Sequence, residues 1–547
     1  MAGDNGRDSV RLTTAQAVVI YLSSQYSERD GQRRRLVAGM FGIFGHGNVA
    51  GLGQALWECG DELPYYQPCN EQSMVHTAAG YARTNMRLAT LACTSSIGPG
   101  ATNMVTGAAT ATINRMPVLL LPSDYYATRH QGPVLQQLEH PVSADISVND
   151  CLRPVSRFFD RITRPEQLLA ALPEAMRVLL DPADTGSVTI ALPQDVQAHA
   201  YDYPRSFLEQ RVWEVERRRP DADRIAAAIE LLKGARRPLI IAGGGVHYSA
   251  AWAELGEFAE RCGIPVGETF AGRGAMREES PLVLGGHGVT GTPVASRLAA
   301  EADLVIAVGT RLTDFTTSSQ SMFQHPEVKF INVNVAAKDA YKQGAVPITA
   351  DAREALKALT AAATAAGLGP DPDYVSRISA LGVEWGCQLE REVFEPIQGE
   401  AMNQGQLIKV MNEEARRGDT IVAAAGGPPG DLHKIWDATG ERHCHLEFGF
   451  SCMGYEIPAG IGVRMCQEEG EVIVYIGDGT YLMNPMELVT AVQEGKKITI
   501  VVANNHGYQV IRALQMGRAG RSFGNEFRAR DAAANRLEGD YLEIDYA

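Results

Sequence analysis

The chain has little of what marks secreted, membrane or nucleic-acid-binding proteins. Among its 547 residues are nine cysteines, none spaced as CxxC, which argues against a disulfide framework or a zinc site. No apolar run reaches the ~18 residues of a membrane span, and the polar N-terminus lacks the apolar core of a signal peptide. A net charge of −15 argues against nucleic acid as a partner. We therefore expect a cytoplasmic protein with reduced thiols that binds neither nucleic acid nor a membrane.

The length exceeds what one hydrophobic core supports, so several domains are expected. Apolar strand-like runs alternate with helical patterns throughout, which predicts doubly wound parallel sheets. We predict three such α/β domains, at 1–205, 213–360 and 375–547. The charged segment 213–220 and the Ala, Gly and Pro-rich segment 361–374 are the expected linkers.

The last residues of the chain predict a strand. Residues 541–547, YLEIDYA, have the composition of a strand and lie only about forty residues beyond Asn505.

The most informative stretch is 471–508, which predicts one βαβ unit. The apolar runs 471–476 and 498–503 are separated by a helical pattern that ends at Gly495. Parallel strands place their C-terminal ends at one edge of a sheet, where open α/β sheets bind ligands. Asp478 and Asn505 directly follow the two strands, so we expect them side by side.

Asp478, Asn505 and nearby carbonyl groups form an oxygen-only set that suits Mg²⁺, which also takes phosphate oxygens as ligands. Gly477 and Gly479 would let a bulky anion approach the backbone. The alternative for the GDG tripeptide alone is an ordinary turn after a strand, but its pairing with Asn504-Asn505 is more specific.

A second glycine-rich turn, at 243–245, is a weak signal for a dinucleotide site. The full GxGxxG spacing is absent, so a structural turn is the favoured interpretation. An NAD-dependent oxidoreductase remains the alternative from a different enzyme class.

Several motifs together resemble the thiamine-diphosphate-dependent enzymes, specifically the acetohydroxyacid synthase and pyruvate decarboxylase group. Besides the GDG and NN pair, they are CNEQSMVHTAAGYAR (69–83), TSSIGPGATNMVTG (94–107), AAAGGPPGDLHKIW (423–436) and FGFSCMGYEIPAGIG (448–462). The resemblance covers the whole chain and implies a pyrimidine-binding, a central Rossmann-like and a diphosphate-binding domain in that order. In that family the diphosphate-binding domain continues further, so the resemblance also implies that the third domain is truncated here. Its last sheet would then lack strand partners, which would leave an apolar edge open to aggregation.

The resemblance also implies roles for individual residues. Asp478, Asn505 and the Gly507 carbonyl would hold Mg²⁺, and Glu71 would hydrogen-bond the aminopyrimidine ring of thiamine diphosphate. Met453 would hold the cofactor in its bent shape. The other implied cofactor contacts are Gly426, Gly427, Ser451, Gly477, Gly479 and Thr480. For Glu71 the alternative is a capping role at the start of a helix.

Segments 42–56 and 132–141 resemble group members that hydrolyse a carbon–carbon bond of a polyhydroxylated cyclic 1,2-diketone in inositol breakdown. Such a reaction needs a base for water, and His46, in a Gly-rich loop after a strand, is the first candidate. It could instead be exposed and idle; His76 and His506 are weaker candidates.

Three other readings stay open at this point. The chain could be a carboligase or decarboxylase of 2-oxo acids, which would share every cofactor residue, or the oxidoreductase named above. It could also be a non-catalytic protein of the thiamine-diphosphate fold. The resemblance further implies a homodimer or homotetramer with active sites at the subunit interface.

Overall fold

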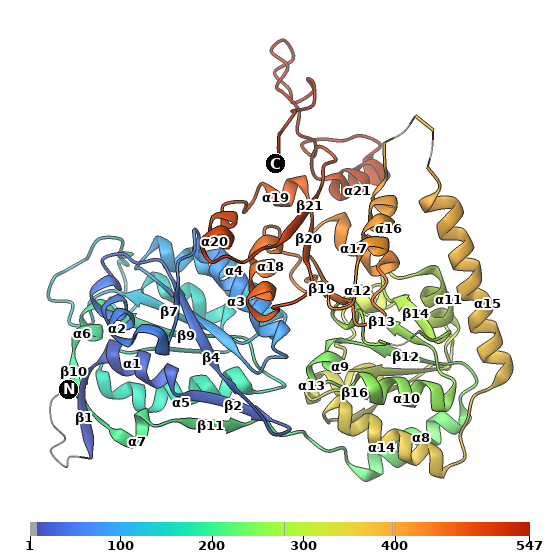
Figure 1. Ribbon diagram of the computed structural model, residues 1–547, viewed down its shortest axis with the longest axis horizontal. Helices are drawn as coiled ribbons and strands as arrows, with labels where there is room; N and C mark the ends of the chain where they lie inside the picture. Colours follow the sequence, from blue (N-terminus) through green and yellow to red (C-terminus); the bar gives the residue numbers. More distant parts are fainter. Residues whose placement is uncertain (1–7, 278, 397, 400, 547) are drawn as a thin grey trace. The chain divides into compact units, whose positions relative to one another are not determined.

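Figure 1 shows the computed structural model, which describes residues 8–277, 279–396, 398–399 and 401–546. The first seven residues of the polar N-terminus lie outside this part. The chain divides into two units, the first made of residues 1–216, 457–468 and 484–498, and the second of the remaining residues.

A six-stranded parallel sheet organises the first unit, in the order β5-β4-β6-β7-β9-β8. Its strands are β4 (Val37–Gly42), β5 (Tyr65–Tyr66), β6 (Thr90–Ser95), β7 (Val118–Asp124), β8 (Phe158–Arg161) and β9 (Ser187–Pro193). The helices of residues 1–216 are α1 (Thr14–Ser23), α2 (Gln54–Cys59), α3 (Glu71–Thr84), α4 (Pro99–Ile113), α5 (Leu168–Leu180), α6 (Gln194–Ala198) and α7 (Arg205–Leu208). The central strands β6, β7 and β9 are buried along their whole length, as predicted from their apolar runs.

Two small sheets complete residues 1–216. Strand β1 (Ser9–Thr13) pairs antiparallel with β10 (Ala200–Pro204), and β2 (Gln25–Arg29) lies between β3 (Gln32–Arg35) and β11 (Arg211–Glu214). Strand β11 corrects the predicted linker at 213–220. Trp213 pairs with Ser27 across the strands, and its indole N–H donates to Gln25 at 3.0 Å. This partner is distant in sequence, so local composition could not reveal it.

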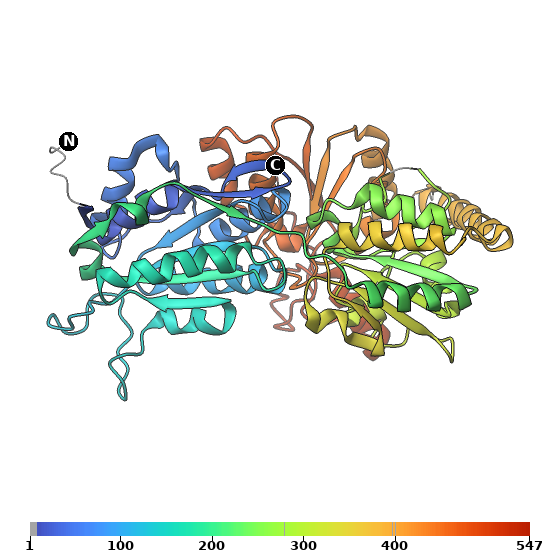
Figure 2. The same ribbon diagram turned by 90° about the horizontal axis from the view of Figure 1, so that it is seen from below.

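A second six-stranded parallel sheet, in the order β14-β13-β12-β15-β16-β17, forms the central domain of the second unit. Its strands are β12 (Pro238–Ala242), β13 (Val266–Glu268), β14 (Val283–Gly286), β15 (Leu304–Val308), β16 (Lys329–Val333) and β17 (Val346–Ile348). Its helices are α8 (Ala222–Gly234), α9 (Gly244–Tyr248), α10 (Trp252–Cys262), α11 (Pro293–Glu301), α12 (Asp314–Thr317), α13 (Ala337–Ala340), α14 (Ala352–Ala365) and α15 (Pro372–Leu389). Figure 2 shows helices of this domain, in green and yellow, on both faces of its sheet.

The predicted linker at 361–374 is largely helical, because α14 runs to Ala365 and α15 begins at Pro372. Helix α15 packs on the central domain. Its buried side chains Tyr374, Ile378 and Leu381 belong to the central core, and the Tyr374 hydroxyl donates to the Pro238 carbonyl at 3.1 Å. By its composition the Ala-rich segment predicts a linker. In the structure its apolar side chains instead pack on residues of the central core that are distant in sequence.

The third sheet is parallel and has the order β19-β18-β20-β21. Its strands are β18 (Thr420–Ala423), β19 (His443–Leu446), β20 (Val472–Gly477) and β21 (Thr499–Ala503). The helices in this part of the sequence are α16 (Gln404–Glu414), α17 (Gly427–Ile435), α18 (Glu456–Cys466), α19 (Asp478–Tyr481), α20 (Glu487–Gln493) and α21 (Gln509–Ala519). Three parallel sheets with intervening helices confirm the predicted α/β fold class.

The strand predicted at the end of the chain is not formed. Of the described residues 541–546, only Tyr541 makes a β-bridge, an isolated one with Arg528. The Tyr541 ring instead stacks on His506 at 4.7 Å between centroids, and the Arg528 guanidinium lies 3.7 Å from the ring centre. Contacts of the Tyr541 side chain are thus present where we expected the backbone hydrogen bonds of a β-strand.

The glycine turn 243–245 is a close contact between backbones. The Gly245 N–H donates to the Gly309 carbonyl at 2.9 Å, and a β-carbon on Gly245 would lie 2.5 Å from the Gly309 α-carbon. The close approach of the two backbones is a structural reason for glycine in this turn. All nine cysteines are free thiols, as expected, and none of the helices in the described ranges is long and apolar enough to span a membrane.

The packing of α15 predicts the cost of truncating its apolar face. Ile378 is 1% exposed in the central core, so Ile378→Ala should lower the free energy of unfolding by about 2–5 kcal/mol. Val383 on the same helix is 68% exposed, and Val383→Ala should change it by no more than about 0.5 kcal/mol. Urea titrations of both variants would check this. Equal losses would mean that α15 does not pack on the central core.

Candidate functional site

Two neighbouring strands bring residues 478 and 505 to one edge of the third sheet. Strand β20 pairs in parallel with β21, with Gly477 opposite Ala503, so Asp478 and Asn505 both follow the C-terminal ends (Figure 1). The strand pattern predicted this juxtaposition. Asp478 differs from the prediction only in starting the short helix α19 and not a loop.

The Asp478 carboxylate is buried and held by backbone donors. Its Oδ2 accepts from the Gly507 N–H at 2.8 Å, and its Oδ1 accepts from the Gly479 N–H at 2.9 Å. Burial raises the pKa of the Asp478 carboxyl, and these backbone hydrogen bonds oppose the rise. A cation at the same place would oppose it further.

The Asn505 amide lies between two oxygen atoms. Its oxygen lies 3.2 Å from Asp478 Oδ1 and 3.1 Å from the Gly507 carbonyl oxygen, and its nitrogen lies 3.1 Å from Gln404 Nε2; only the opposite orientation of the amide would turn these contacts into hydrogen bonds. The structure thus brings three oxygens together, from Asp478, Asn505 and Gly507, an arrangement that a cation would stabilise. Neutral and anionic oxygens alone are the ligands that Mg²⁺ prefers, so the donor set fits this ion.

Gly507 occupies a backbone conformation that only glycine adopts easily. Its φ is +131°, and a β-carbon there would lie 2.5 Å from the Asn525 carbonyl oxygen. The neighbouring Tyr508 N–H donates to the same carbonyl at 2.8 Å. The Gly507 carbonyl is therefore held in place beside Asp478 and Asn505.

Glu456 is a buried carboxylate that sequence reasoning missed. It accepts from the Ala425 N–H at 3.2 Å and from the Thr480 hydroxyl at 3.0 Å, and Thr480 in turn accepts from the Gly454 N–H at 2.8 Å. Burial raises the pKa of Glu456 to about 7. A single acid within the apolar stretch 455–463 was the signal that could have revealed it.

Through Glu456 and Thr480, three stretches of the predicted cofactor site are joined. They are the turn after β18, the segment leading into α18, and the GDGT turn after β20. A hydrogen-bond network of this kind is stable in a buried place only if its members are satisfied. The network gives these stretches one shared geometry.

Two other cofactor candidates, Gly426 and Ser451, have left-handed backbone. Gly426 has φ +81° and directly precedes α17, whose first residue is Gly427. Ser451 has φ +53°, a left-handed conformation that glycine adopts more easily than serine. The buried Glu447 caps this turn by accepting from the N–H groups of Phe450 and Cys452 at 2.8 and 3.0 Å, and half-buried Met453 follows.

Around Asp478, the other two glycines differ in their surroundings. A β-carbon on Gly479 would lie 2.7 Å from the Tyr508 ring, whereas one on Gly477 would meet no protein atom within 4 Å. Gly477 thus leaves open space next to the carboxylate, as a bulky anion would require.

Glu71 is the first residue of α3 in the first unit, and Asn70 is the N-cap. Its Oε2 accepts from Asn103 Nδ2 at 3.0 Å. A β-carbon on Gly100 would lie 2.9 Å from its Oε1, so α4 leaves room for this carboxylate. The Asn70 side chain already accepts from the N–H groups of Gln72 and Ser73, so the capping function does not need Glu71.

The turn before Glu71 is held by a second carboxylate. Glu487 is 1% exposed and accepts from the Cys69 N–H at 3.1 Å and from the Thr490 hydroxyl at 2.7 Å. Burial raises the pKa of the Glu487 carboxyl. This contact, within the first unit, sets where α3 begins.

His46 lies in the turn after β4 and is half-buried. Its Nε2 is 3.0 Å from the Leu135 carbonyl, and its own carbonyl accepts from Gln194 Nε2 at 2.8 Å. A carbonyl can only accept, so Nε2 carries the proton and Nδ1 is the atom that can take one.

The two weaker histidines are poorly suited to act on water. His76 is completely buried in α3, which lowers its pKa to about 3, and its Nε2 lies 3.1 Å from Gln72 Nε2. His506 stacks on Tyr541 and occupies left-handed backbone at φ +61°.

Three protein-family models match the chain and together cover most of it. The thiamine pyrophosphate enzyme N-terminal TPP binding domain matches residues 33–143, the central domain matches 225–359, and the C-terminal TPP binding domain matches 424–539. Their order and places agree with the three parallel sheets.

Curated relatives are similar over nearly the whole chain. Proteins named 3D-(3,5/4)-trihydroxycyclohexane-1,2-dione hydrolase from Bacillus cereus (strain AH820), Bacillus anthracis (strain CDC 684 / NRRL 3495) and Bacillus thuringiensis (strain Al Hakam) are each 45% identical to it. Each alignment covers 98% of this chain and 87% of the relative. On the three family matches and on these relatives, the chain belongs to the thiamine pyrophosphate enzyme family.

Proposed function

We propose that the chain hydrolyses a carbon–carbon bond of a cyclic 1,2-diketone, 3D-(3,5/4)-trihydroxycyclohexane-1,2-dione, to give 5-deoxy-D-glucuronate, with thiamine diphosphate and Mg²⁺ as cofactors. The observation that carries the proposal is the 45% identity, over 98% of the chain, to relatives named for this substrate. The oxygen set of Asp478, Asn505 and Gly507 supports the cofactor part.

In this proposal the second unit holds the diphosphate end of the cofactor. Asp478, Asn505 and the Gly507 carbonyl would bind Mg²⁺, which would accept the diphosphate oxygens. The turns at Gly426 and Ser451 would supply backbone groups, and Met453 would support the bent form of the cofactor.

Glu71 would bind a nitrogen of the aminopyrimidine ring. By accepting a hydrogen bond from that nitrogen, the Glu71 carboxylate would favour the imino tautomer of the ring. When bound, thiamine diphosphate would supply a nucleophilic carbon and a ring that can store electrons. The environment of Glu71, beside Asn103 and Gly100, suits one bound ring nitrogen.

His46 would act on water. The overall reaction adds one water across the bond between the two carbonyl carbons, so that one carbon ends as a carboxylate and the other as an aldehyde. Nδ1 of His46 would take the proton as water attacks, the part that a histidine general base plays.

A homodimer or larger assembly is part of the proposal, with each active site built from two subunits, as in the family resembled. Exposed apolar side chains on α21 support an interface there, because Val510, Ile511 and Leu514 are 42–57% exposed. A monomeric form should then be inactive.

The decisive experiment measures turnover of the cyclic dione with thiamine diphosphate and Mg²⁺ added or withheld. We expect activity that needs both, and Asp478→Ala should weaken activation by Mg²⁺ by at least about tenfold. Asp540→Ala, an exposed aspartate of the same domain, is the control and should behave as wild type. Turnover of pyruvate without turnover of the dione would instead identify a 2-oxo acid decarboxylase or carboligase. Tight binding of NAD without thiamine diphosphate would refute both.

Glu71→Gln tests the proton-transfer role separately. The amide keeps the shape but not the charge, so kcat should fall by about 10²–10⁴-fold while thiamine diphosphate still binds. Calorimetric titration with the cofactor and steady-state kinetics would measure the two effects. Glu62→Gln, on the exposed surface of the same domain, should leave both unchanged. An active Glu71→Gln enzyme would contradict this assignment.

Glu456 predicts a pH dependence of stability. Its pKa is raised in the folded chain to about 7 from an ordinary 4.5. The stabilisation is complete below pH 4.5 and is lost as the pH rises through 7, by about 1.4 kcal/mol per unit of pKa difference. Glu456→Gln should therefore unfold at a urea concentration less dependent on pH between 4.5 and 7 than wild type, both without cofactor. Identical pH profiles would show that Glu456 is not buried as described.

A further inference from the structure

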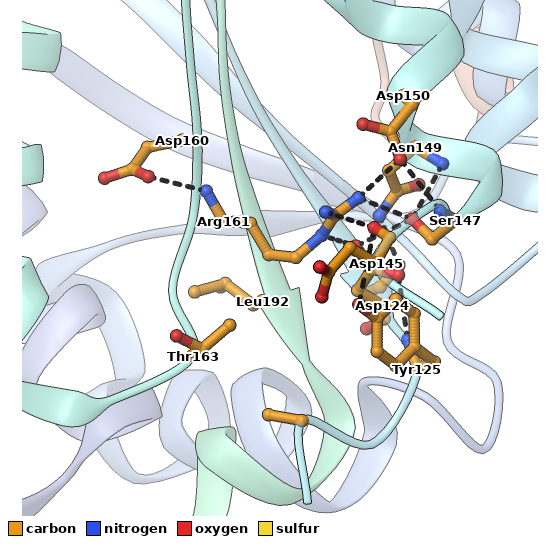
Figure 3. Close-up of polar contacts among 12 residues, drawn as sticks. Asp124, Tyr125, Asp145, Ser147, Asn149, Asp150, Asp160, Arg161, Thr163 and Leu192 are labelled. Carbon is orange, nitrogen blue, oxygen red and sulfur yellow. Dashed lines mark hydrogen bonds and ion pairs between the residues drawn. The ribbon is translucent and has the colours of Figure 1, made fainter. Parts of the chain in front are cut away.

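The irregular segment 125–147, between β7 and the 3₁₀ turn at Val148–Val155, is closed at its base by one arginine (Figure 3). Arg161, the last residue of β8, lies with its guanidinium between the two ends of the segment. Its side chain is only 11% exposed. All of these residues belong to the first unit.

Four hydrogen bonds from Arg161 define the clasp. Nε donates to Asp124 Oδ2 at 2.7 Å at the start of the segment. At its end, Nη1 donates to the Asp145 carbonyl at 2.9 Å, and Nη2 donates to Ser147 Oγ and to Asp150 Oδ2, both at 2.8 Å. The planar guanidinium suits several directed bonds at once, which a lysine ammonium does not reproduce.

Asp124, directly before the segment, also accepts hydrogen bonds from both of its ends. Ser147 Oγ donates to Asp124 Oδ2 at 3.0 Å, and the Tyr125 N–H donates to Asp124 Oδ1 at 2.9 Å. The Asp124 side chain is 2% exposed. Without Arg161 it would be a buried charge lacking its cationic partner, which is costly.

The middle of the segment reaches the turn that carries His46. The Leu135 carbonyl is the group 3.0 Å from His46 Nε2. Next to it, the Gln136 carbonyl packs on the start of α4, where a β-carbon on Gly98 would be 2.2 Å away. The segment therefore lies across the strand ends of this sheet.

Helix α6 anchors both partners of this contact. Asp195 accepts from the N–H groups of Ala127 and Thr128 at 2.9 and 3.1 Å, near the start of the segment. On the same helix, Gln194 and Gln197 donate to the carbonyls of His46 and Gly47, each at 2.8 Å. The histidine turn and the segment thus share one rigid support.

We propose that Arg161 is a positioning residue that holds segment 125–147 closed, so that the Leu135 carbonyl fixes the His46 imidazole with its proton on Nε2. Nδ1 is then the atom turned to proton transfer, as in other sites where a hydrogen bond to one ring nitrogen sets the role of the other. The catalytic meaning of this geometry rests on the proposed function.

The test uses the full chain with thiamine diphosphate and Mg²⁺, as wild type, Arg161→Ala, Arg161→Lys and Arg153→Ala. Arg153 is the matched control, since it also bonds Asp150, at 2.6 Å, but its side chain is 53% exposed and it makes none of the clasp bonds to the segment. Trypsin cleavage after the exposed Arg129 reports opening of the segment. Magic-angle-spinning ¹⁵N spectra of ring-labelled histidine, assigned against His46→Gln, report the tautomer.

We expect Arg161→Ala to be cleaved after Arg129 several-fold faster, to lose the Nε2–H preference of His46, and to lose about 10- to 100-fold in kcat/KM, the range for lost supporting contacts. Arg161→Lys should recover part of each, and Arg153→Ala should match wild type. If Arg161→Ala does not fold, the lysine variant carries the same three measurements.

The proposal would be overturned if the Arg161 variants kept the wild-type rate of cleavage after Arg129 and the wild-type His46 tautomer. Faster cleavage with an unchanged His46 tautomer would overturn it as well. An unchanged kcat/KM in an opened Arg161→Ala would also overturn it. Should the wild type not turn over the cyclic dione, the proposed function fails, whereas cleavage and tautomer still decide the role of Arg161.

Discussion

The parallel pairing of β20 with β21 is the constraint on which the candidate cofactor site depends. It brings Gly477 opposite Ala503 and so delivers Asp478 and Asn505 to the same edge. The Gly507 N–H bonds the Asp478 carboxylate at 2.8 Å, which locks the second strand's turn onto the first. Without this register, the three oxygens could not face one point.

Buried carboxylates organise both cofactor-related regions. Glu456 joins three turns of the second unit, and Glu487 holds the turn from which α3 and Glu71 start in the first unit. Each is surrounded by backbone N–H and hydroxyl donors, which offset the cost of burial. Both carboxylates act as hydrogen-bond acceptors inside the protein. The burial that this role requires raises the pKa of each.

In the first unit, the turn that carries His46, the proposed general base, is supported by longer-range contacts. His46 takes its orientation from the Leu135 carbonyl, and the segment carrying Leu135 is closed by Arg161 and anchored by Asp195. Loops that carry function are positioned by a rigid scaffold in this way. The buried ion pair of Arg161 and Asp124 therefore bears on a histidine that neither residue contacts.

The sequence by itself determined the fold class, most strands and helices, and the meeting of Asp478 with Asn505, because parallel strand ends follow from a local alternation of apolar runs and turns. It also marked Glu71 and His46, though not their surroundings. Only the tertiary structure decided that Trp213 lies in a strand, that α15 packs on the central core, that residues 541–546 form no strand ladder, and that Glu456 links the cofactor turns. Each of these depends on partners distant in sequence, and no local pattern encodes which distant surface buries a side chain or which carbonyl sets a histidine tautomer.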